Sequence, residues 1–322
     1  MALYDKVGAL SQALEKIIVG QHKLVQRLLL ALFADGHLLV EGAPGLAKTK
    51  SIKALSQLIE ADFHRIQFTP DLLPADITGT EMYQTEVRKF SFQPGPVFHN
   101  LILADEINRA AAKVQSALLE AMEERQVSIG NVTHKLPKLF LVMATQNPIE
   151  QEGTYSLPEA QLDRFMMHVK ISYPDIATEK TILRLNREEH LLKETQNRHQ
   201  QTLLSQDDIF SVRRAIMNVH MDASIEEYIV QLIMATRTPE KYCEKLGPLI
   251  EYGASPRASI FLDRASRAMA WLRNRDFVAL SDVTDILHEV LRHRIGLTFE
   301  AQSLGYTTDR VIDEIRDAVA LP

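Results

Sequence analysis

The stretch that decides the fold is Gly42-Ala43-Pro44-Gly45-Leu46-Ala47-Lys48-Thr49, which directly follows the apolar run His37-Leu38-Leu39-Val40-Glu41. An apolar strand that turns through a glycine-rich loop into a helix is the pattern of a phosphate-binding loop. In such a loop backbone N–H groups surround the phosphates, Lys48 adds a positive charge, and the Thr49 hydroxyl can bind Mg²⁺. The segment therefore predicts a nucleotide site, with a plain turn between strand and helix as the alternative.

One position of this loop departs from the general pattern, which has glycine directly before the lysine. This chain has Ala47 there. A methyl group is tolerated at such a position if the residue keeps a negative φ, because residues other than glycine rarely enter the left-handed region. We therefore expect a negative φ at Ala47.

Length and composition limit the class of protein. The chain has 322 residues, of which 46% are hydrophobic and 24% charged, as in a soluble globular protein. Its net charge of -6 provides no global positive field for non-specific nucleic-acid binding. The single Cys243 excludes an internal disulfide. The first residues lack the layout of a secretory signal and no stretch is apolar enough to span a membrane, so we expect a cytoplasmic protein.

Five short apolar segments alternate with helical or loop-like stretches in the first half of the chain. They cover residues 37–41, 63–68, 101–105, 139–145 and 166–171. This alternation predicts an α/β fold with a parallel sheet covered by helices on both faces. Two further stretches, 69–95 and 126–133, carry turn residues beside β-prone ones and predict hairpin insertions. In the first of them, Phe90 and Phe92 suit a hairpin core and a surface that grips a partner equally well.

The character of the sequence changes after Tyr173 and Pro174, where strand-like runs end. The helices that we expect beyond this point cover residues 178–192, 207–219, 225–236, 255–273 and 281–293. A polar tract at 193–201 is expected to form a solvated connection. We therefore predict an α/β core over residues 1–175 and a smaller all-helical domain over residues 176–322.

Two strand ends carry the chemistry expected beside a phosphate loop. The apolar run at 101–104 is followed by Asp105 and Glu106. ATP hydrolysis needs one carboxylate that holds Mg²⁺, predicted to be Asp105 acting through water. It needs a second that orients and polarises the attacking water, predicted to be Glu106. Acidic residues are also common before a helix, which is the simpler alternative. Asn147 follows the next strand, where its amide could reach the γ-phosphate or the water, or could merely form a turn with Pro148.

With these motifs the chain resembles the AAA+ ATPases and, within them, the MoxR family. The matching stretches follow one another in order over nearly the whole chain: Ile18 to Gln21, Gly42 to Thr49, Phe68 to Gly79, Ala104 to Ala110, Glu120 to Glu124, Ala144 to Pro148, Leu157 to Phe165 and Gly253 to Ala258. The resemblance implies an AAA+ nucleotide-binding core followed by a helical lid. MoxR-like loops commonly carry alanine at the position of Ala47.

The resemblance also implies roles that the residues alone do not establish. Arg164 is similar to the arginine finger, which stabilises charge on a nucleotide bound by the neighbouring subunit. Arg257 is similar to the lid arginine that contacts nucleotide in its own subunit, and Val19 and Gly20 would line the adenine. Each of these residues also has a simpler interpretation. Arg164 could be a surface arginine, Arg257 an arginine in the first turn of a helix, and Gly20 a glycine that ends a helix.

These implied roles complete the predicted site. The predicted catalytic residues are Lys48, Glu106, Asn147 and Arg164; the metal ligands are Thr49 and Asp105; the cofactor-binding residues are Val19, Gly20, Gly42, Ala43, Pro44, Gly45, Leu46, Ala47, Lys48, Thr49 and Arg257. The implied cofactors are ATP and Mg²⁺.

An arginine supplied by a neighbour requires assembly through a head-to-tail interface. The resemblance implies a ring of six subunits that remodels or matures a protein client, often one with a von Willebrand factor A domain or one that receives a metal cofactor. Two other functions stay open. A nucleic-acid motor is disfavoured by the acidic composition, and a scaffold that binds ATP without hydrolysing it is disfavoured by the catalytic set.

Overall fold

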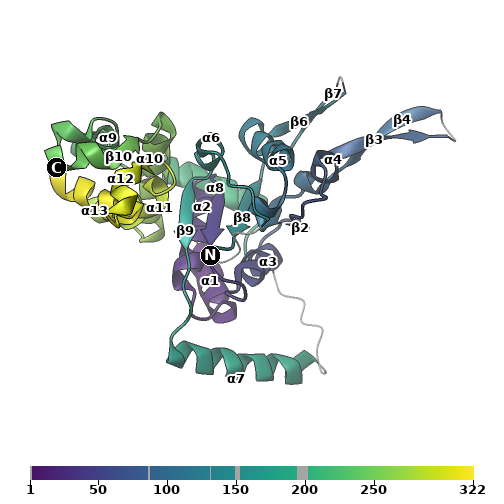
Figure 1. Ribbon diagram of the computed structural model, residues 1–322. Coiled ribbons are helices and arrows are strands. Elements are labelled where there is room, and N and C mark those ends of the chain that lie inside the picture. The colour runs from purple at the N-terminus through teal and green to yellow at the C-terminus, as the bar shows by residue number, and fades with distance from the viewer. Residues whose placement is uncertain (1, 86–87, 131, 149–152, 194–201) are drawn as a thin grey trace. The chain divides into compact units, whose positions relative to one another are not determined.

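The computed structural model describes the chain except residues 1, 86–87, 131, 149–152 and 194–201, with the backbone alone for 188–193 (Figure 1). Most of the connection expected at 193–201 therefore lies outside the described residues. Contacts divide the chain into two compact units. The first holds Met1–Leu29, Leu39–Ser156 and Val169–Ile209, and the second holds Leu30–Leu38, Leu157–His168 and Phe210–Pro322. The boundary expected near residue 175 stays a prediction.

A five-stranded sheet with the order β2-β5-β8-β1-β9 lies at the centre of the α/β part. Its strands are β1 (Leu38–Glu41), β2 (Phe63–Gln67), β5 (Leu101–Asp105), β8 (Leu141–Gln146) and β9 (Met167–Lys170). β5 pairs in parallel with β2 on one side and with β8 on the other. Every residue of β5 is buried, as expected for a strand covered on both faces. The predicted parallel sheet is confirmed.

Helices separate the strands of this part of the chain, and several of them bury apolar residues. They are α1 (Leu3–Ile17), α2 (His22–Phe33), α3 (Lys48–Leu58), α4 (Pro74–Thr78), α5 (Ala112–Glu124), α6 (Glu159–Leu162), α7 (Ile176–Lys193) and α8 (Gln206–Met217), with short 3-10 turns at Pro96–Phe98 and Ile107–Arg109. On α5, Val114, Leu118 and Met122 recur every fourth residue and are all buried. No helix within the described ranges combines the length and apolar character needed to cross a bilayer.

Two antiparallel hairpins extend from the first unit (Figure 1). β3 (Gly79–Gln84) pairs with β4 (Lys89–Pro94), and β6 (Gln126–Ile129) pairs with β7 (Val132–Lys135). Gly79 begins the first hairpin with φ +91, and a Cβ there would lie 2.3 Å from the Gln93 carbonyl oxygen. Only glycine fits this turn without displacing backbone. Both predicted hairpins are confirmed.

Phe90 and Phe92, which the sequence left undecided, have different environments. Phe92 stacks on His134 of β7 with ring centroids 3.9 Å apart, and contacts Phe98 edge-on at 5.4 Å. Phe90 is 66% exposed and its ring lies 5.2 Å from that of Tyr83. Phe92 therefore belongs to a small aromatic core, whereas Phe90 belongs to the hairpin surface.

The second unit is mainly helical, as predicted. Its helices include α9 (Ala223–Arg237), α10 (Pro256–Leu272), α11 (Leu280–Leu291), α12 (Phe299–Ser303) and α13 (Thr308–Ala318), with 3-10 turns at Pro239–Lys241 and Glu244–Leu249. One feature corrects the expectation of an all-helical domain: β10 (Ile250–Tyr252) and β11 (Gly296–Leu297) form an antiparallel pair. Strands of two and three residues are too short to show a period in the sequence.

Candidate nucleotide site

The phosphate-loop segment joins the end of β1 to α3, which begins at Lys48. Gly45 has φ +83 and Ala47 has φ 57, so the loop enters the left-handed region twice. The expectation of a negative φ at Ala47 is therefore wrong. The turn needs this conformation immediately before the helix, whose unpaired N–H groups at its start form an anion site. The need for that turn outweighs the steric cost of one methyl group.

The strain at Ala47 gives a testable stability difference. An alanine held in the left-handed region costs about 1–2 kcal/mol, a strain that glycine relieves. Glycine also makes the unfolded chain more flexible, which lowers the free energy of unfolding by about 0.4–1 kcal/mol and offsets part of that gain. We expect Ala47→Gly to raise the free energy of unfolding by up to about 1 kcal/mol, measured by denaturant unfolding. The matched control is Ala43→Gly, because Ala43 in the same loop is not among the positive-φ residues. An equal loss of stability in both variants would contradict this account.

Thr145 of β8 hydrogen-bonds both acidic residues at the end of β5, the first through its carboxylate and the second through its backbone. Its hydroxyl donates to Oδ1 of Asp105 at 2.6 Å and accepts the backbone N–H of Glu106 at 2.9 Å. Glu106 has φ 56, in the left-handed region, which is a strained conformation for glutamate and is typical of functional sites. Thr145 is fully buried, so the positions of Asp105 and Glu106 are set from within the sheet.

The edge strand β2 supplies two further partners for these carboxylates. Arg65 donates to Oδ2 of Asp105 through Nε at 3.0 Å and Nη2 at 2.7 Å. Gln67 donates through Nε2 to Oε2 of Glu106 at 3.0 Å. Arg109 also reaches Oε2 of Glu106, at 3.1 Å. The sequence analysis missed Arg65 and Gln67, because the register that places Gln67 opposite Asp105 appears only once the strands pair. It also missed Arg109, which lies three residues after Glu106 in the chain.

One cavity of about 410 Å³ collects most of the predicted residues of the first unit. It is lined by Pro44, Gly45, Leu46, Ala47, Lys48, Thr49, Lys50, Arg65, Asp105, Glu106 and Asn147. The ends of parallel strands thus meet beside a helix start, the usual place for a ligand in an α/β sheet. Lys48 donates from Nζ to the carbonyl oxygen of Gly42 at 2.7 Å.

The donor atoms in this cavity fit a magnesium ion. Asp105 offers a carboxylate and Thr49 a hydroxyl, both at the cavity wall. Mg²⁺ binds such hard oxygen ligands, and usually takes few from the protein and the rest from water and phosphate. Asn147 is 6% exposed at the same wall, so its amide is held inside the cavity.

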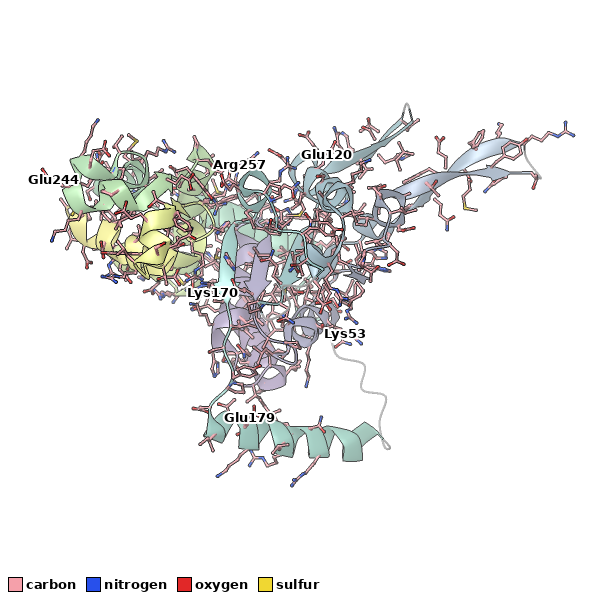
Figure 2. The ribbon with its side chains drawn as sticks, viewed as in Figure 1. Lys53, Glu120, Lys170, Glu179, Glu244 and Arg257 are labelled. Atoms are coloured by element: carbon pink, nitrogen blue, oxygen red, sulfur yellow. The ribbon has the colours of Figure 1, made fainter. Side chains whose placement is uncertain are left out.

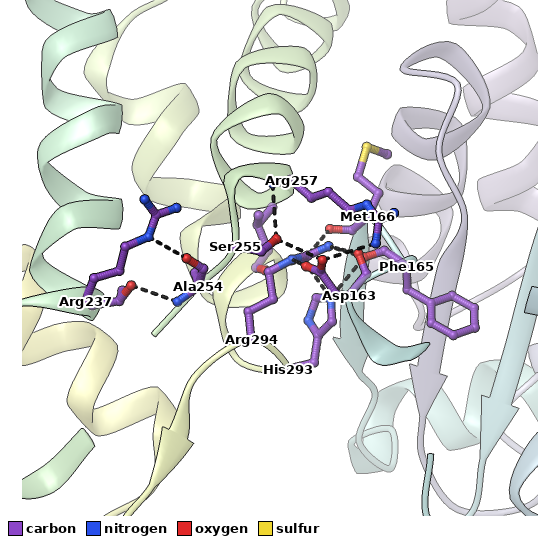
Figure 3. Close-up of polar contacts among 11 residues, drawn as sticks. Asp163, Phe165, Met166, Arg237, Ala254, Ser255, Arg257, His293 and Arg294 are labelled. Atoms are coloured by element: carbon purple, nitrogen blue, oxygen red, sulfur yellow. Dashed lines mark hydrogen bonds and ion pairs between the residues drawn. The ribbon is translucent and has the colours of Figure 1, made fainter. Parts of the chain in front are cut away.

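A second polar cluster, within the second unit, is centred on Asp163 (Figure 3). Arg294 donates from Nε to Oδ1 of Asp163 at 2.7 Å, and Ser255 donates from Oγ to Oδ2 at 2.8 Å. Arg257 donates from Nη1 to Oδ2 at 3.4 Å. The structure thus places Arg257, one of the two predicted nucleotide arginines, on the carboxylate of Asp163, the residue that precedes Arg164 in the sequence.

One charge of this cluster, that of Arg294, is deeply buried. Arg294 is 4% exposed, and burial lowers its pKa to about 10, against the opposing effect of Asp163. Ser255 also accepts the backbone N–H of Arg257 at 3.2 Å and so caps α10. The sequence analysis missed the pair of Asp163 and Arg294, whose contact joins positions 131 residues apart.

His293 is expected to make the stability of the folded chain depend on pH. Burial lowers its pKa well below the usual range, and the neighbouring Arg294 charge lowers it further. Above pH about 6.5 the imidazole is neutral both folded and unfolded; below that pH the unfolded chain binds one more proton than the folded one. Stability should therefore fall on acidification from that point, by up to about 1.4 kcal/mol per pH unit from this group.

This pH dependence is measured by urea unfolding of the wild type and His293→Gln at pH 7.5 and 5.5. We expect the variant to lose less stability between these pH values than the wild type. The matched control is His22→Gln, which removes a histidine whose side chain is 74% exposed. Equal losses in the wild type and in His293→Gln would show that His293 does not contribute.

Comparison with known proteins identifies the family. The model of the ATPase family associated with various cellular activities (AAA) matches residues 37–167, and that of the AAA lid domain matches residues 247–315. Chaperone MoxR1 of Mycobacterium tuberculosis is 44% identical over 309 residues, which cover 96% of this chain and 80% of that protein. The chain belongs to the MoxR family of AAA+ ATPases.

Other relatives agree with this MoxR assignment. Protein MoxR of Methylorubrum extorquens is 31% identical over 304 residues, covering 91% of this chain and 88% of that protein. A crystal structure of a candidate ATPase from Cytophaga hutchinsonii has a TM-score of 0.91 at 45% identity and covers 99% of this chain and 96% of its own. The predicted AAA+ core and helical lid are thereby confirmed.

The MoxR resemblance assigned Val19 and Gly20, among others, to nucleotide binding. Neither of these two residues lines the 410 Å³ cavity. Gly20 follows α1 with φ +79, and a Cβ there would lie 2.1 Å from Cγ2 of Thr178 in α7. Glycine is therefore required where the two segments approach. The contact of Val19 and Gly20 with adenine stays a prediction, as do the roles of Arg164 and Arg257.

Proposed function

We propose that this MoxR-family protein hydrolyses ATP with Mg²⁺ and uses the energy to remodel or mature a protein client. The observation that carries the proposal is the shared cavity. Lys48 and Thr49 at the start of α3 line the same wall as Asp105, Glu106 and Asn147 at the ends of two strands. A phosphate-binding helix start beside two carboxylates is the arrangement that phosphoryl transfer to water requires.

Each side chain has a defined part in this proposal. The loop N–H groups and Lys48 bind the β- and γ-phosphates, while Asp105 and Thr49 hold Mg²⁺, which neutralises charge on the phosphates. Glu106 orients the attacking water and polarises it, and for this its carboxylate must exchange its bonds to Gln67 and Arg109 for one to water. Asn147 donates its amide to the γ-phosphate or to the water.

Arg164 is proposed to act across a subunit interface. It would reach the γ-phosphate bound by a neighbour and stabilise the charge that develops in the transition state. A subunit that offers a nucleotide site on one surface and Arg164 on another assembles head to tail, and such an interface closes into a ring when its rotation permits. We propose a ring of six subunits in the cytoplasm.

The client is proposed to be a protein, since Mycobacterium MoxR1 is named a chaperone. The hairpin surface supports this proposal. Met82, Tyr83 and Phe90 on β3 and β4 are 51%, 52% and 66% exposed, and a group of exposed apolar side chains on a projecting hairpin suits contact with another protein. Proteins with a von Willebrand factor A domain and proteins that receive a metal cofactor are the proposed classes of client.

The proposal is tested by phosphate release from ATP together with affinity capture. Capture uses the Glu106→Gln form, which should hold ATP and client together. Turnover that DNA stimulates in a salt-sensitive way would favour the nucleic-acid motor instead. A wild type that binds ATP but never releases phosphate would favour the non-hydrolysing scaffold, and capture of nothing beyond the protein itself would contradict the remodelling role.

A further inference from the structure

The segment that carries the predicted arginine finger joins two short elements. Arg164 lies between α6 (Glu159–Leu162) and β9 (Met167–Lys170), each of which has four residues. A single helical turn does not keep its shape without support from other parts of the fold. The peptide carbonyls of residues 163–166 therefore need hydrogen-bond partners from elsewhere in the chain.

Arg294, which follows the end of α11, supplies such partners (Figure 3). Its Nη2 donates to the carbonyl oxygens of Asp163 at 2.7 Å and Phe165 at 2.6 Å, the residues on either side of Arg164. Its Nε donates to the Asp163 carboxylate at 2.7 Å, and its Nη1 donates to the carbonyl oxygen of Met166 at 3.4 Å. One guanidinium thus bonds both neighbours of the predicted finger.

The guanidinium of Arg294 is itself held in place. Its Nη1 also donates to the carbonyl oxygen of Val290 in α11 at 2.5 Å, and its carbon Cζ lies 5.0 Å from the centre of the Phe261 ring on α10. The Arg294 side chain is 1% exposed. Displacing a charge buried to this extent would break bonds that water cannot replace. Arg294 is therefore fixed in one position by α10 and α11.

The start of α10 holds Asp163 as well. Ser255, which caps α10, donates to Oδ2 of Asp163 at 2.8 Å, and Arg257 in the first turn of this helix donates to the same oxygen at 3.4 Å (Figure 2). Oδ1 of Asp163 accepts from Arg294. The residue before Arg164 cannot rotate without breaking bonds at both carboxylate oxygens.

We propose that Arg294 is a positioning residue for Arg164: its bonds to the carbonyls on both sides of Arg164 fix the direction in which that side chain leaves the backbone. The inference rests on the proposed function, since it assumes that Arg164 acts on a nucleotide bound by the neighbouring subunit. Displacing a catalytic group by about 1 Å can lower a rate about 10²-fold. A buried arginine of one subunit thereby sets the turnover of the next.

Arg294→Lys tests the proposal in the full chain. Lysine keeps a positive charge beside Asp163, but its single ammonium group cannot donate to the same set of carbonyls as a planar guanidinium. We expect kcat, measured by phosphate release, to fall about 10- to 100-fold. The affinity for ATP, measured with a fluorescent analogue, should stay within about twofold of the wild type, because the variant's own nucleotide site is unchanged.

The matched control is Arg292→Lys. The Arg292 side chain is also buried, at 7% exposed, and it donates from Nη1 to the carbonyl oxygen of His168 at 2.8 Å. His168 lies outside the segment 163–166, so the contacts around Arg164 stay intact in this variant. It should change kcat by no more than about twofold.

Mixed rings separate positioning of the finger from a general loss of structure. In a mixture of Arg294→Lys with Lys48→Ala, the first variant offers an intact nucleotide site and the second an intact, supported Arg164. About a quarter of the interfaces join the two, so turnover should rise to about a quarter of the wild-type rate. A mixture of Arg294→Lys with Arg164→Ala should show no such gain. A defect in the variant's own nucleotide site would give the opposite pattern, and a folding defect would give no gain with either partner.

An unchanged kcat in Arg294→Lys, or a loss that co-assembly with Lys48→Ala does not restore, would overturn the proposal. If Arg294→Lys does not fold, Asp163→Asn takes its place, because it removes the charge that holds Nε of Arg294, and it must show the same dependence on the partner. Recovery in the mixture of Lys48→Ala with Arg164→Ala, without recovery for Arg294→Lys, would remove only the role of Arg294. No recovery in either mixture would contradict the proposed function as well.

Discussion

Replacing Arg164 with alanine is expected to lower the turnover of ATP by about 10³-fold or more, the effect of removing an arginine finger. The reason is electrostatic: a guanidinium beside the γ-phosphate stabilises charge that water cannot stabilise as well in a closed interface. Because Arg164 is proposed to act on the neighbour's nucleotide, the variant should bind ATP with nearly the affinity of the wild type. The measurement is kcat from phosphate release, with ATP binding followed separately by a fluorescent analogue.

The control for Arg164→Ala is Arg214→Ala, which removes an exposed arginine from α8 in the same unit. It should change kcat less than twofold, as surface ion pairs contribute little. A loss of ATP affinity equal to the loss of kcat in Arg164→Ala would place this arginine in its own subunit's binding site and contradict the action across an interface.

Glu106→Gln is expected to lower kcat by about 10²- to 10⁴-fold, the usual contribution of a general base. Glutamine keeps the size of the side chain and can still pair with Gln67, so ATP binding should persist. The matched control is Glu120→Gln, an exposed position on α5. A single-turnover assay distinguishes slow chemistry from slow product release, and normal single-turnover rates in Glu106→Gln would exclude Glu106 as the base.

The sheet and the strand-end carboxylates could be predicted from the sequence because each leaves a local signal. β5 and β8 each begin with a continuous apolar run. Asp105, Glu106 and Asn147 stand at the carboxyl ends of these strands, the edge of a parallel sheet where ligands usually bind. The loop before α3 is recognisable because glycine and proline are needed at fixed positions. A run of apolar residues that predicts a fully buried strand, and the change to polar residues at its end, can be recognised in the sequence without knowing which strands lie beside it.

The partners of these residues could not be predicted, because pairing and distance decide them. Arg65 and Gln67 matter only through the register between β2 and β5, which no local pattern encodes. Asp163 and Arg294 meet across 131 positions. The error at Ala47 has a different cause: the steric rule for a single residue was applied where the turn as a whole decides the conformation.

The central claim is that one subunit binds the nucleotide while its neighbour supplies Arg164. Mixing Lys48→Ala with Arg164→Ala tests it directly, since each variant alone lacks one half of every composite site. In a mixed ring about a quarter of the interfaces would join an intact nucleotide site to an intact Arg164, so phosphate release should reappear at a comparable fraction of the wild-type rate. A mixture that co-assembles, as shown by co-purification through a tag on one variant, yet releases no phosphate would contradict the claim.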